Sequence, residues 1–185
     1  MIDWQIYTKY GTQVPQKGTG HERAFSSGIP HAAAHIWIWK KENDELYLLF
    51  QKAAPKVDYK VGLLDISAAG HIDLNEDEVA AAIRETKEEL GISINTDDLY
   101  FAGVEHYQRK TEDSHKDELR FVYTVEYRDD MTFTFPDGEV DGVEWIKAKN
   151  SEEIVSRNEF KERFVQHTNH YFNIVFSGIN GQNLI

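Results

Sequence analysis

The chain has 185 residues, enough for one domain with a substantial hydrophobic core and too few for two comfortable ones. Hydrophobic residues make up 41% and aromatic residues 12%, which excludes an intrinsically disordered chain. A net charge of −12 without any basic run argues against a nucleic-acid partner, and the lack of cysteine excludes disulfides, thiolate metal sites and a thiol nucleophile.

The N-terminal sequence shows no targeting signal. It begins Met-Ile-Asp-Trp-Gln, which lacks both the basic start and the apolar core of a signal peptide. We also find no stretch that is apolar enough for a membrane-spanning helix. The expected location is therefore the cytoplasm, without a membrane partner.

A single domain is expected, with two unequal parts. Residues 1–30 should contain an edge strand at Ile2–Thr8, followed by an irregular lead-in, because this stretch is polar and rich in turn-forming residues. Residues 31–185 should form the main body of the domain.

Two strong strands are predicted next, at Ala33–Lys40 and Leu46–Gln51, joined by a turn over residues 41–44. In the first of them, Trp37 and Trp39 alternate with isoleucine. This pattern is typical of a strand that is buried on both faces, so it favours core packing over ligand stacking for both tryptophans.

The remaining elements alternate in type, which predicts a layered α/β fold with a mixed sheet. Four further strands are expected at Leu63–Ala68, Leu99–Tyr107, Leu119–Tyr127 and Val143–Lys147. The C-terminal stretch Ser151–Phe176 is predicted to be helical, in two pieces that are broken near Arg157-Asn158.

A helix is predicted from about residue 76 to residue 90, directly after a glycine loop. Asn75 is the expected N-cap, with Glu78 three residues on, and Gly91 is the expected end. One side of this helix is apolar and should pack on the sheet. Its residues are Val79, Ala80, Ala82, Ile83 and Leu90.

The other side of this helix carries a cluster of glutamates. Glu85, Glu88 and Glu89 are three and four residues apart and therefore share one face, where their like charges repel. A neutralising cation is expected, and carboxylate ligands without cysteine suit Mg²⁺, or Mn²⁺ in its place. Arg84 lies four residues before Glu88 and can hold that carboxylate in place.

These residues belong to a longer pattern that resembles the Nudix box. Gly70, Glu76, Arg84, Glu85, Glu88, Glu89, Gly91 and Ile92 fill its positions in register. The one departure is Thr86, where the family prefers an apolar residue, and its methyl group can still face the core. The resemblance implies the Nudix α/β/α sandwich with a mixed sheet and a loop-helix box at the mouth of the sheet.

The resemblance also implies an activity. It is Mg²⁺-dependent hydrolysis of a diphosphate linkage in a nucleoside diphosphate derivative or a related small diphosphate. Glu88, Glu89 and the Gly70 carbonyl are expected to hold the metal, Glu85 to be a further ligand or the base that activates water, and Arg84 to orient the glutamates.

Residues outside the box complete the expected site. Many Nudix hydrolases recruit one more acid, for which Glu118 is the first choice, as a metal ligand, and Glu144 the second. The expected contacts to substrate are His71, Lys52, Lys56, Lys60 and Arg109.

A second resemblance covers roughly residues 4 to 147 and points to the isopentenyl-diphosphate isomerase-like branch of the superfamily. His31, His71 and Glu118 match metal ligands of the isomerases, but Lys116 stands at another ligand position and Ala69 where they have a catalytic cysteine. Isomerase activity is therefore the alternative to hydrolysis. Whether His31 and His71 form a residual second metal site stays open.

Another alternative is a non-catalytic, nucleotide-sensing Nudix module, against which the intact glutamate set argues.

The other histidines are expected to be structural. His35 should be packed in its strand, four residues and about 13 Å from His31. His106 and His115 should lie in or beside the polar segment between two strands, and His167 and His170 on the surface of the last helix. Oligomeric state cannot be read from the sequence.

Overall fold

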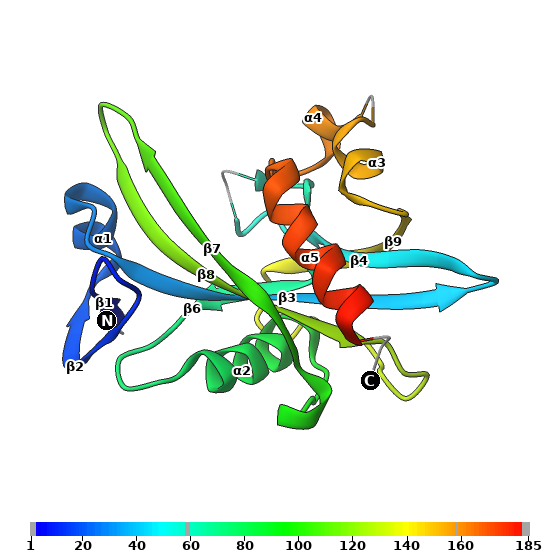
Figure 1. The fold of residues 1–185 in the computed structure, drawn as a ribbon, viewed down its shortest axis with the longest axis horizontal. Coiled ribbons are helices and arrows are strands. Elements are labelled where there is room, and N and C mark those ends of the chain that lie inside the picture. Colours follow the sequence, from blue (N-terminus) through cyan, green and yellow to red (C-terminus); the bar gives the residue numbers. More distant parts are fainter. Residues whose placement is uncertain (1–2, 58–59, 158, 183–185) are drawn as a thin grey trace.

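A mixed sheet with helices on both faces organises the molecule (Figure 1). The computed structural model describes residues 3–57, 60–157 and 159–182. The central strand is β3, to which α2 packs on one face and α5 on the other. The predicted α/β/α sandwich is confirmed.

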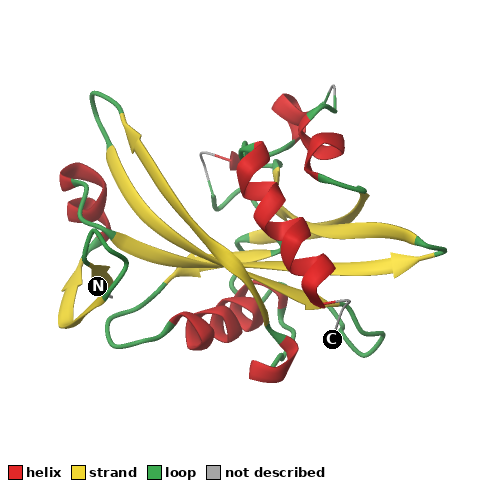
Figure 2. Cartoon of the chain, in the orientation of Figure 1, coloured by secondary structure: helices red, strands yellow, loops and turns green. Residues whose placement is uncertain are grey.

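Figure 2 distinguishes the helices from the strands by colour. The strands are β1 (Trp4–Tyr7), β2 (Gln13–Thr19), β3 (His31–Glu42), β4 (Glu45–Ala53), β5 (Leu64–Asp65), β6 (Ala68–His71), β7 (Tyr100–Lys110), β8 (His115–Glu126) and β9 (Val140–Lys147). The helices are α1 (His21–Ser27), α2 (Glu78–Leu90), the 3₁₀ turn η2 (Thr96–Asp98), α3 (Ser151–Val155), α4 (Phe160–Arg163) and α5 (Asn169–Gln182).

The position of β3 brings the glycine loop to the centre of the sheet. On one side, β3 pairs in parallel with β8. On its other side, β3 pairs in antiparallel fashion with β6 and β4. The β6 pairing sets Gly70 opposite Ala34. The hairpin to β4 turns at Asn43 and Asp44, whose φ values of 50° and 62° suit these residue types.

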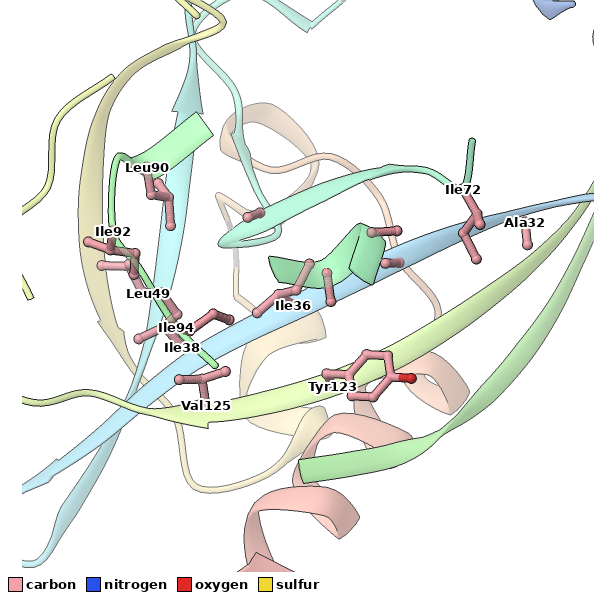
Figure 3. Close-up of a cluster of buried hydrophobic side chains, with 14 of the residues drawn as sticks. Ala32, Ile36, Ile38, Leu49, Ile72, Leu90, Ile92, Ile94, Tyr123 and Val125 are labelled. Atoms are coloured by element: carbon pink, nitrogen blue, oxygen red, sulfur yellow. The ribbon is translucent and has the colours of Figure 1, made fainter. Parts of the chain in front are cut away.

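Alternate residues of β3 enter two separate cores. Ile36 and Ile38 point to the cluster beneath α2 (Figure 3), whereas Trp37 and Trp39 point to the cluster beneath α5. Both tryptophans are buried, with 0% and 1% exposure, so their predicted packing role is confirmed. A strand with apolar side chains on both faces is what a sandwiched central strand requires.

The irregular lead-in was a wrong prediction. Residues 13–27 form β2 and α1, and β2 pairs with β1. Both elements lie at the rim of the sheet and are mostly exposed, so their apolar residues do not recur at the spacing of a strand or a helix. The sequence therefore contains no periodic signal for either of them. A strand in this region is confirmed as β1, but it is not an edge strand, because it pairs with β2 on one side and with β3 on the other. Ile2 lies outside the described residues.

Two further predictions need correction. The strand expected at Leu63–Ala68 is split into β5 and β6, because the Ser67 hydroxyl donates to the Leu49 carbonyl and accepts from the Ile38 N–H. The C-terminal region forms α3, α4 and α5 rather than two pieces. Asn158, one of the two residues at the predicted break, lies outside the described residues.

Candidate active site

The box helix begins later than the sequence suggests. Asp77, not Asn75, is the N-cap of α2, and its side chain accepts the Ala80 N–H at 2.7 Å. Asn75 has a left-handed φ of 67° and lies in the turn before the helix. At the other end Gly91 has φ 69° and its N–H donates to the Lys87 carbonyl, which confirms the predicted end.

The docking face of α2 is close to the prediction. Ala81, Ala82 and Leu90 are buried, but Ala80 is exposed, so it was wrongly assigned to this face. Thr86 is fully buried and its hydroxyl donates to the Ala82 carbonyl, so the helix itself satisfies the one polar group at this position. The departure from the family pattern therefore has no visible cost.

Arg84 gathers the acidic residues of the site. Its Nη1 donates to Glu85 and, at 3.1 Å, to Glu88. Its Nε and Nη2 hold Glu76 at 2.9 Å and 2.8 Å, and Nη2 also donates to the His71 carbonyl at 2.9 Å. One guanidinium thus ties the glycine loop to three carboxylates of the loop and helix, in the manner expected of a group that orients them.

Glu85 lies directly against the glycine loop. A Cβ atom at Gly70 would come within 1.9 to 2.5 Å of the Glu85 carboxyl atoms. Any other residue at position 70 would therefore displace this carboxylate. The close approach explains why the loop has a glycine here, and it brings the backbone of residue 70 and a carboxylate together.

Glu89 lies beneath the loop and Glu88 outside it. The Glu89 side chain is buried, and its Oε2 accepts the Ala69 N–H at 2.9 Å and the Gln51 Nε2–H at 3.3 Å. Glu88 is half exposed. The box glutamates thus range from buried to solvent-facing along one edge of α2.

The electrostatics of this cluster favour a cation. Burial, with the neighbouring charges of Glu88 and Glu76, raises the pKa of Glu85 to about 7 against the effect of Arg84. Burial raises the pKa of Glu89 to about 8. Both carboxyls therefore resist ionisation while no cation is near, and a divalent ion would stabilise the charged forms. The donors are all oxygens, which fits Mg²⁺ or Mn²⁺.

Glu118 belongs to a neighbouring cluster. Its Oε2 lies 3.7 Å from His31 Nε2, 3.5 Å from His71 Nε2 and 2.7 Å from Lys116 Nζ. Its Oε1 accepts from Arg120 Nε at 2.8 Å. We call His31, His71 and Glu118 the histidine cluster. It meets the box at His71, whose carbonyl binds Arg84, and the predicted role of Glu118 at the box metal stays a prediction.

Two of the basic residues predicted to contact substrate lie near acidic side chains on the surface. Lys52 lies 3.6 Å from Asp141, and Lys56 lies 3.3 Å from Glu139, with both lysines about half exposed. Arg109 is exposed on β7. These are surface positions from which a side chain can move to a phosphate, and their roles stay predictions.

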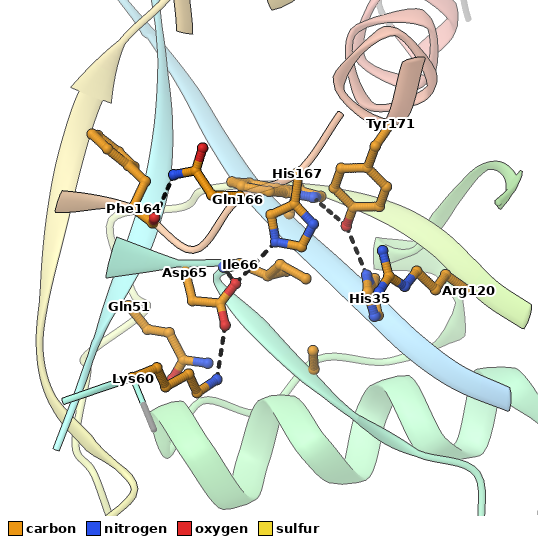
Figure 4. Close-up of polar contacts among 12 residues, drawn as sticks. His35, Gln51, Lys60, Asp65, Ile66, Arg120, Phe164, Gln166, His167 and Tyr171 are labelled. Atoms are coloured by element: carbon orange, nitrogen blue, oxygen red, sulfur yellow. Dashed lines mark hydrogen bonds and ion pairs between the residues drawn. The ribbon is translucent and has the colours of Figure 1, made fainter. Parts of the chain in front are cut away.

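A buried polar network was missed by the sequence analysis (Figure 4). Asp65 lies between Lys60 Nζ at 2.7 Å and His167 Nε2 at 3.1 Å. The surface position predicted for His167 is wrong, because its side chain is only 7% exposed and precedes α5. An aspartate inside the apolar run Leu63-Leu64-Asp65-Ile66 was the available signal for a buried partner.

The other histidines largely follow expectation. His35 is buried as predicted, and its Nδ1 lies 2.7 Å from the Tyr171 hydroxyl. His170 is exposed. His106 is on β7, with its Nε2 2.7 Å from Asp117, and His115 begins β8, so both lie beside the segment between these strands.

The fold and the site define an α/β protein with a glycine loop and a glutamate-lined helix held together by one arginine. The chain belongs to the NUDIX domain family, which matches residues 29–168. The predicted Nudix resemblance is thereby confirmed, whereas the isomerase-like branch is not decided by this match.

Curated relatives share part of the chain. It is 38% identical over 77 residues to an uncharacterized Nudix hydrolase of Clostridium acetobutylicum, a match that covers 42% of this chain and 37% of the relative. It is 37% identical over 70 residues to Nudix hydrolase 3 of Arabidopsis thaliana, covering 38% of this chain and 9% of that protein. Each match therefore spans well under half of the relative.

Solved structures share the fold. The protein DR0079 of Deinococcus radiodurans superposes with a TM-score of 0.61 at 16% identity, over 92% of this chain and 96% of the other. A binary complex of the Ap4A hydrolase of C. elegans gives a TM-score of 0.53 at 22% identity, over 82% and 98%. Among the described residues, no helix is both long and apolar enough to cross a membrane.

Proposed function

We propose that this protein hydrolyses a diphosphate linkage in a small molecule, with Mg²⁺ as cofactor and Mn²⁺ as a substitute. The observation that carries the proposal is the arginine-held site, in which Arg84 gathers Glu85 and Glu88 beside the glycine loop and Glu89 lies beneath it. Arg84 supplies one positive charge to these carboxylates, and a multivalent cation would neutralise the remaining charge.

The residues have distinct roles in the proposed site. Gly70, Glu85, Glu88 and Glu89 would hold the ion, which supplies neutralisation of the diphosphate charge and lowers the pKa of bound water. Glu85, which lies against the glycine loop, is a further ligand or the base that accepts the proton of the attacking water. Arg84 keeps the carboxylates in one arrangement as charge develops at phosphorus.

A nucleotide is the substrate class to test first. Two solved structures with this fold are described as an Ap4A hydrolase and as a Nudix domain bound to ADP ribose, and both ligands contain diphosphate linkages. Lys52, Lys56, Arg109 and His71 are the proposed contacts to the substrate. The overall charge of −12 means that such local cations and the metal must attract the anionic substrate.

Isomerisation of an allylic diphosphate is the alternative, favoured by the histidine cluster. Allylic proton transfer needs an acid beside the substrate, and the methyl group of Ala69 cannot supply a proton. This residue lies on β6, opposite His35 of β3 and directly before the first glycine of the box. Hydrolysis remains the preferred proposal.

The test is Mg²⁺-dependent turnover of nucleoside diphosphates, dinucleotides and prenyl diphosphates by wild type, Glu89→Gln and Glu78→Gln. Glu78 lies on the same helix, at a position that the box pattern leaves unspecified, and serves as the matched control. We expect Glu89→Gln to lower kcat/KM by more than about 100-fold. Replacing a residue that only hydrogen-bonds to a metal ligand already lowers activity by up to about 100-fold, and replacing the ligand itself should lower it at least as much. The control should change it by less than about twofold.

Three outcomes would contradict this assignment in different ways. Equal rates in wild type and Glu89→Gln would refute the metal site. Conversion of a prenyl diphosphate without release of phosphate would favour the isomerase. Binding of a nucleotide without turnover of any diphosphate would favour the sensing module.

A further inference from the structure

The histidine cluster has the geometry of a cation site. The ligand atoms of His31, His71 and Glu118 all lie within 4.8 Å of one another. The two histidine Nε2 atoms lie 3.7 Å and 3.5 Å from Glu118 Oε2, near the separation of about 3.4 Å that a tetrahedral ion with bonds of about 2.1 Å imposes. Both Nε2 atoms are buried without a hydrogen-bond partner.

The Ile29 carbonyl orients the ring of His31. It lies 2.9 Å from His31 Nδ1 and can only accept, so Nδ1 carries a proton. Nε2 is then the atom that faces the Glu118 carboxylate, 3.7 Å away. A positive group beside this buried carboxylate would stabilise its charged form.

We infer that the Lys116 ammonium is this positive group, a built-in cation that takes the place of a metal ion and keeps the histidine cluster metal-free. Its Nζ lies 2.7 Å from Glu118 Oε2, the oxygen that both histidines face. The divalent metal centre of the protein is then confined to the box. The inference concerns a cluster outside the proposed catalytic carboxylates.

The surrounding residues hold Lys116 in place. Its Nζ lies 5.3 Å from the ring centre of Phe25 and 5.9 Å from that of Tyr107, and its side chain is only 23% exposed. Ammonium groups are attracted to aromatic faces at such distances. Phe25 is on α1, in the segment before the family match begins, so the N-terminal region of this chain contributes to the ammonium site.

The local charges are already balanced. Arg120 binds Glu118 through Nε and Glu105 through Nη1 at 2.9 Å, and Lys116 binds Glu118. Two carboxylates thus face two cations, and each oxygen of Glu118 has a positive partner. A divalent ion added here would create an excess of two positive charges next to an ammonium, in a buried place where charge is weakly screened.

The N-terminal strand closes the cluster. The ring of Trp4 stacks on His71 at 3.5 Å between centroids, with an interplanar angle of 10°, and on His31 at 5.3 Å. Trp4 thus packs on the faces of both imidazole rings. Lys116 reaches Glu118 along β8, the strand on which both residues lie.

Binding of Co²⁺ tests the inference without measuring catalysis. The parent protein is the full chain with Glu85→Gln and Glu89→Gln, which disables the box as a metal site. Into it we would introduce Lys116→Met, which keeps the length and packing of the side chain, or Lys116→Glu, which adds a ligand. The visible absorption of Co²⁺ reports tetrahedral histidine and carboxylate ligation, and Lys110→Met on the same hairpin is the matched control.

We expect the parent and its Lys110→Met form to show no cobalt spectrum, and the Lys116 variants to bind one equivalent at least ~100-fold more tightly. Adding His71→Ala to these variants should abolish the spectrum. The inference is overturned if the parent itself binds one equivalent that depends on His71. It is equally overturned if the Lys116 variants, shown to be folded by circular dichroism, bind no better than the parent. Neither result depends on turnover, so the proposed function stands or fails separately.

Discussion

At the scale of single residues, hydrogen-bond chemistry determines the protonation of His35. Trp37 Nε1 can only donate, so the Tyr171 hydroxyl accepts from it at 3.0 Å and donates its own proton to His35 Nδ1. Burial, together with the positive charge of Arg120, lowers the pKa of His35 well below 6.5. His35 is therefore neutral in the folded protein.

This neutral histidine predicts a pH-dependent stability. The folded pKa is below the unfolded value, so the contribution of His35 is present above about pH 6.5 and declines as the pH falls and the unfolded chain takes up a proton. Between pH 7.5 and 5.5 the wild type should lose about 1.4 kcal/mol more of its free energy of unfolding than His35→Gln. Urea unfolding at both pH values measures this difference, and an identical loss in the two proteins would contradict it.

At the scale of elements, the box helix shows what local sequence can specify. The spacing of Glu85, Glu88 and Glu89 predicted their common edge, and Gly91 predicted the end of the helix, because both depend only on helical geometry. The start was misplaced by about two residues, because Asn75 and Asp77 are both good caps. Only the backbone conformation of the preceding turn distinguishes them.

The cap assignment can be checked by substitution. Asp77→Ala removes the acceptor for the Ala80 N–H and should lower the free energy of unfolding by about 1 kcal/mol. Asn75→Gly is the matched control, since glycine adopts the left-handed φ of 67° without strain and no cap is lost. Chemical denaturation of both variants gives the comparison. A larger loss for Asn75→Gly would restore Asn75 as the cap.

At the scale of the whole molecule, one buried ion-pair network connects distant parts of the chain. Asp65 on β5 pairs with His167, 102 residues away and just before α5, and with Lys60 in the preceding loop. The Val165 N–H also donates to the Leu64 carbonyl, so backbone and side chains together attach the C-terminal segment to the sheet. The network lies near the box, since Gln51 pairs with Asp65 in the sheet and contacts Glu89 through its side chain.

We therefore expect Asp65→Asn to be strongly destabilising. Removing one member of a buried pair leaves charge without a partner, and the typical cost is about 3 kcal/mol or more. The comparison is Glu144→Gln, which breaks an exposed pair with Arg163 and should have a far smaller effect. Thermal unfolding and amide exchange in α5 would measure both. Equal effects would show that the network does not stabilise attachment of the C-terminal segment.

The layered fold, the burial of Trp37 and Trp39 and the common edge of the box glutamates could be predicted without coordinates, because periods of two and 3.6 residues reflect local geometry. The spacing of the box residues also indicated the family. The resemblance to the isomerases placed His31, His71 and Glu118 in one ligand set, but the contacts of Glu118 with Lys116 and Arg120 are seen only in the folded chain. The parallel pairing of β3 with β8 sets Glu118 opposite His31, and the β7–β8 hairpin brings Tyr107 beside Lys116. Such partners depend on strand register between segments far apart in the chain, and residue spacing within one segment carries no information about that register.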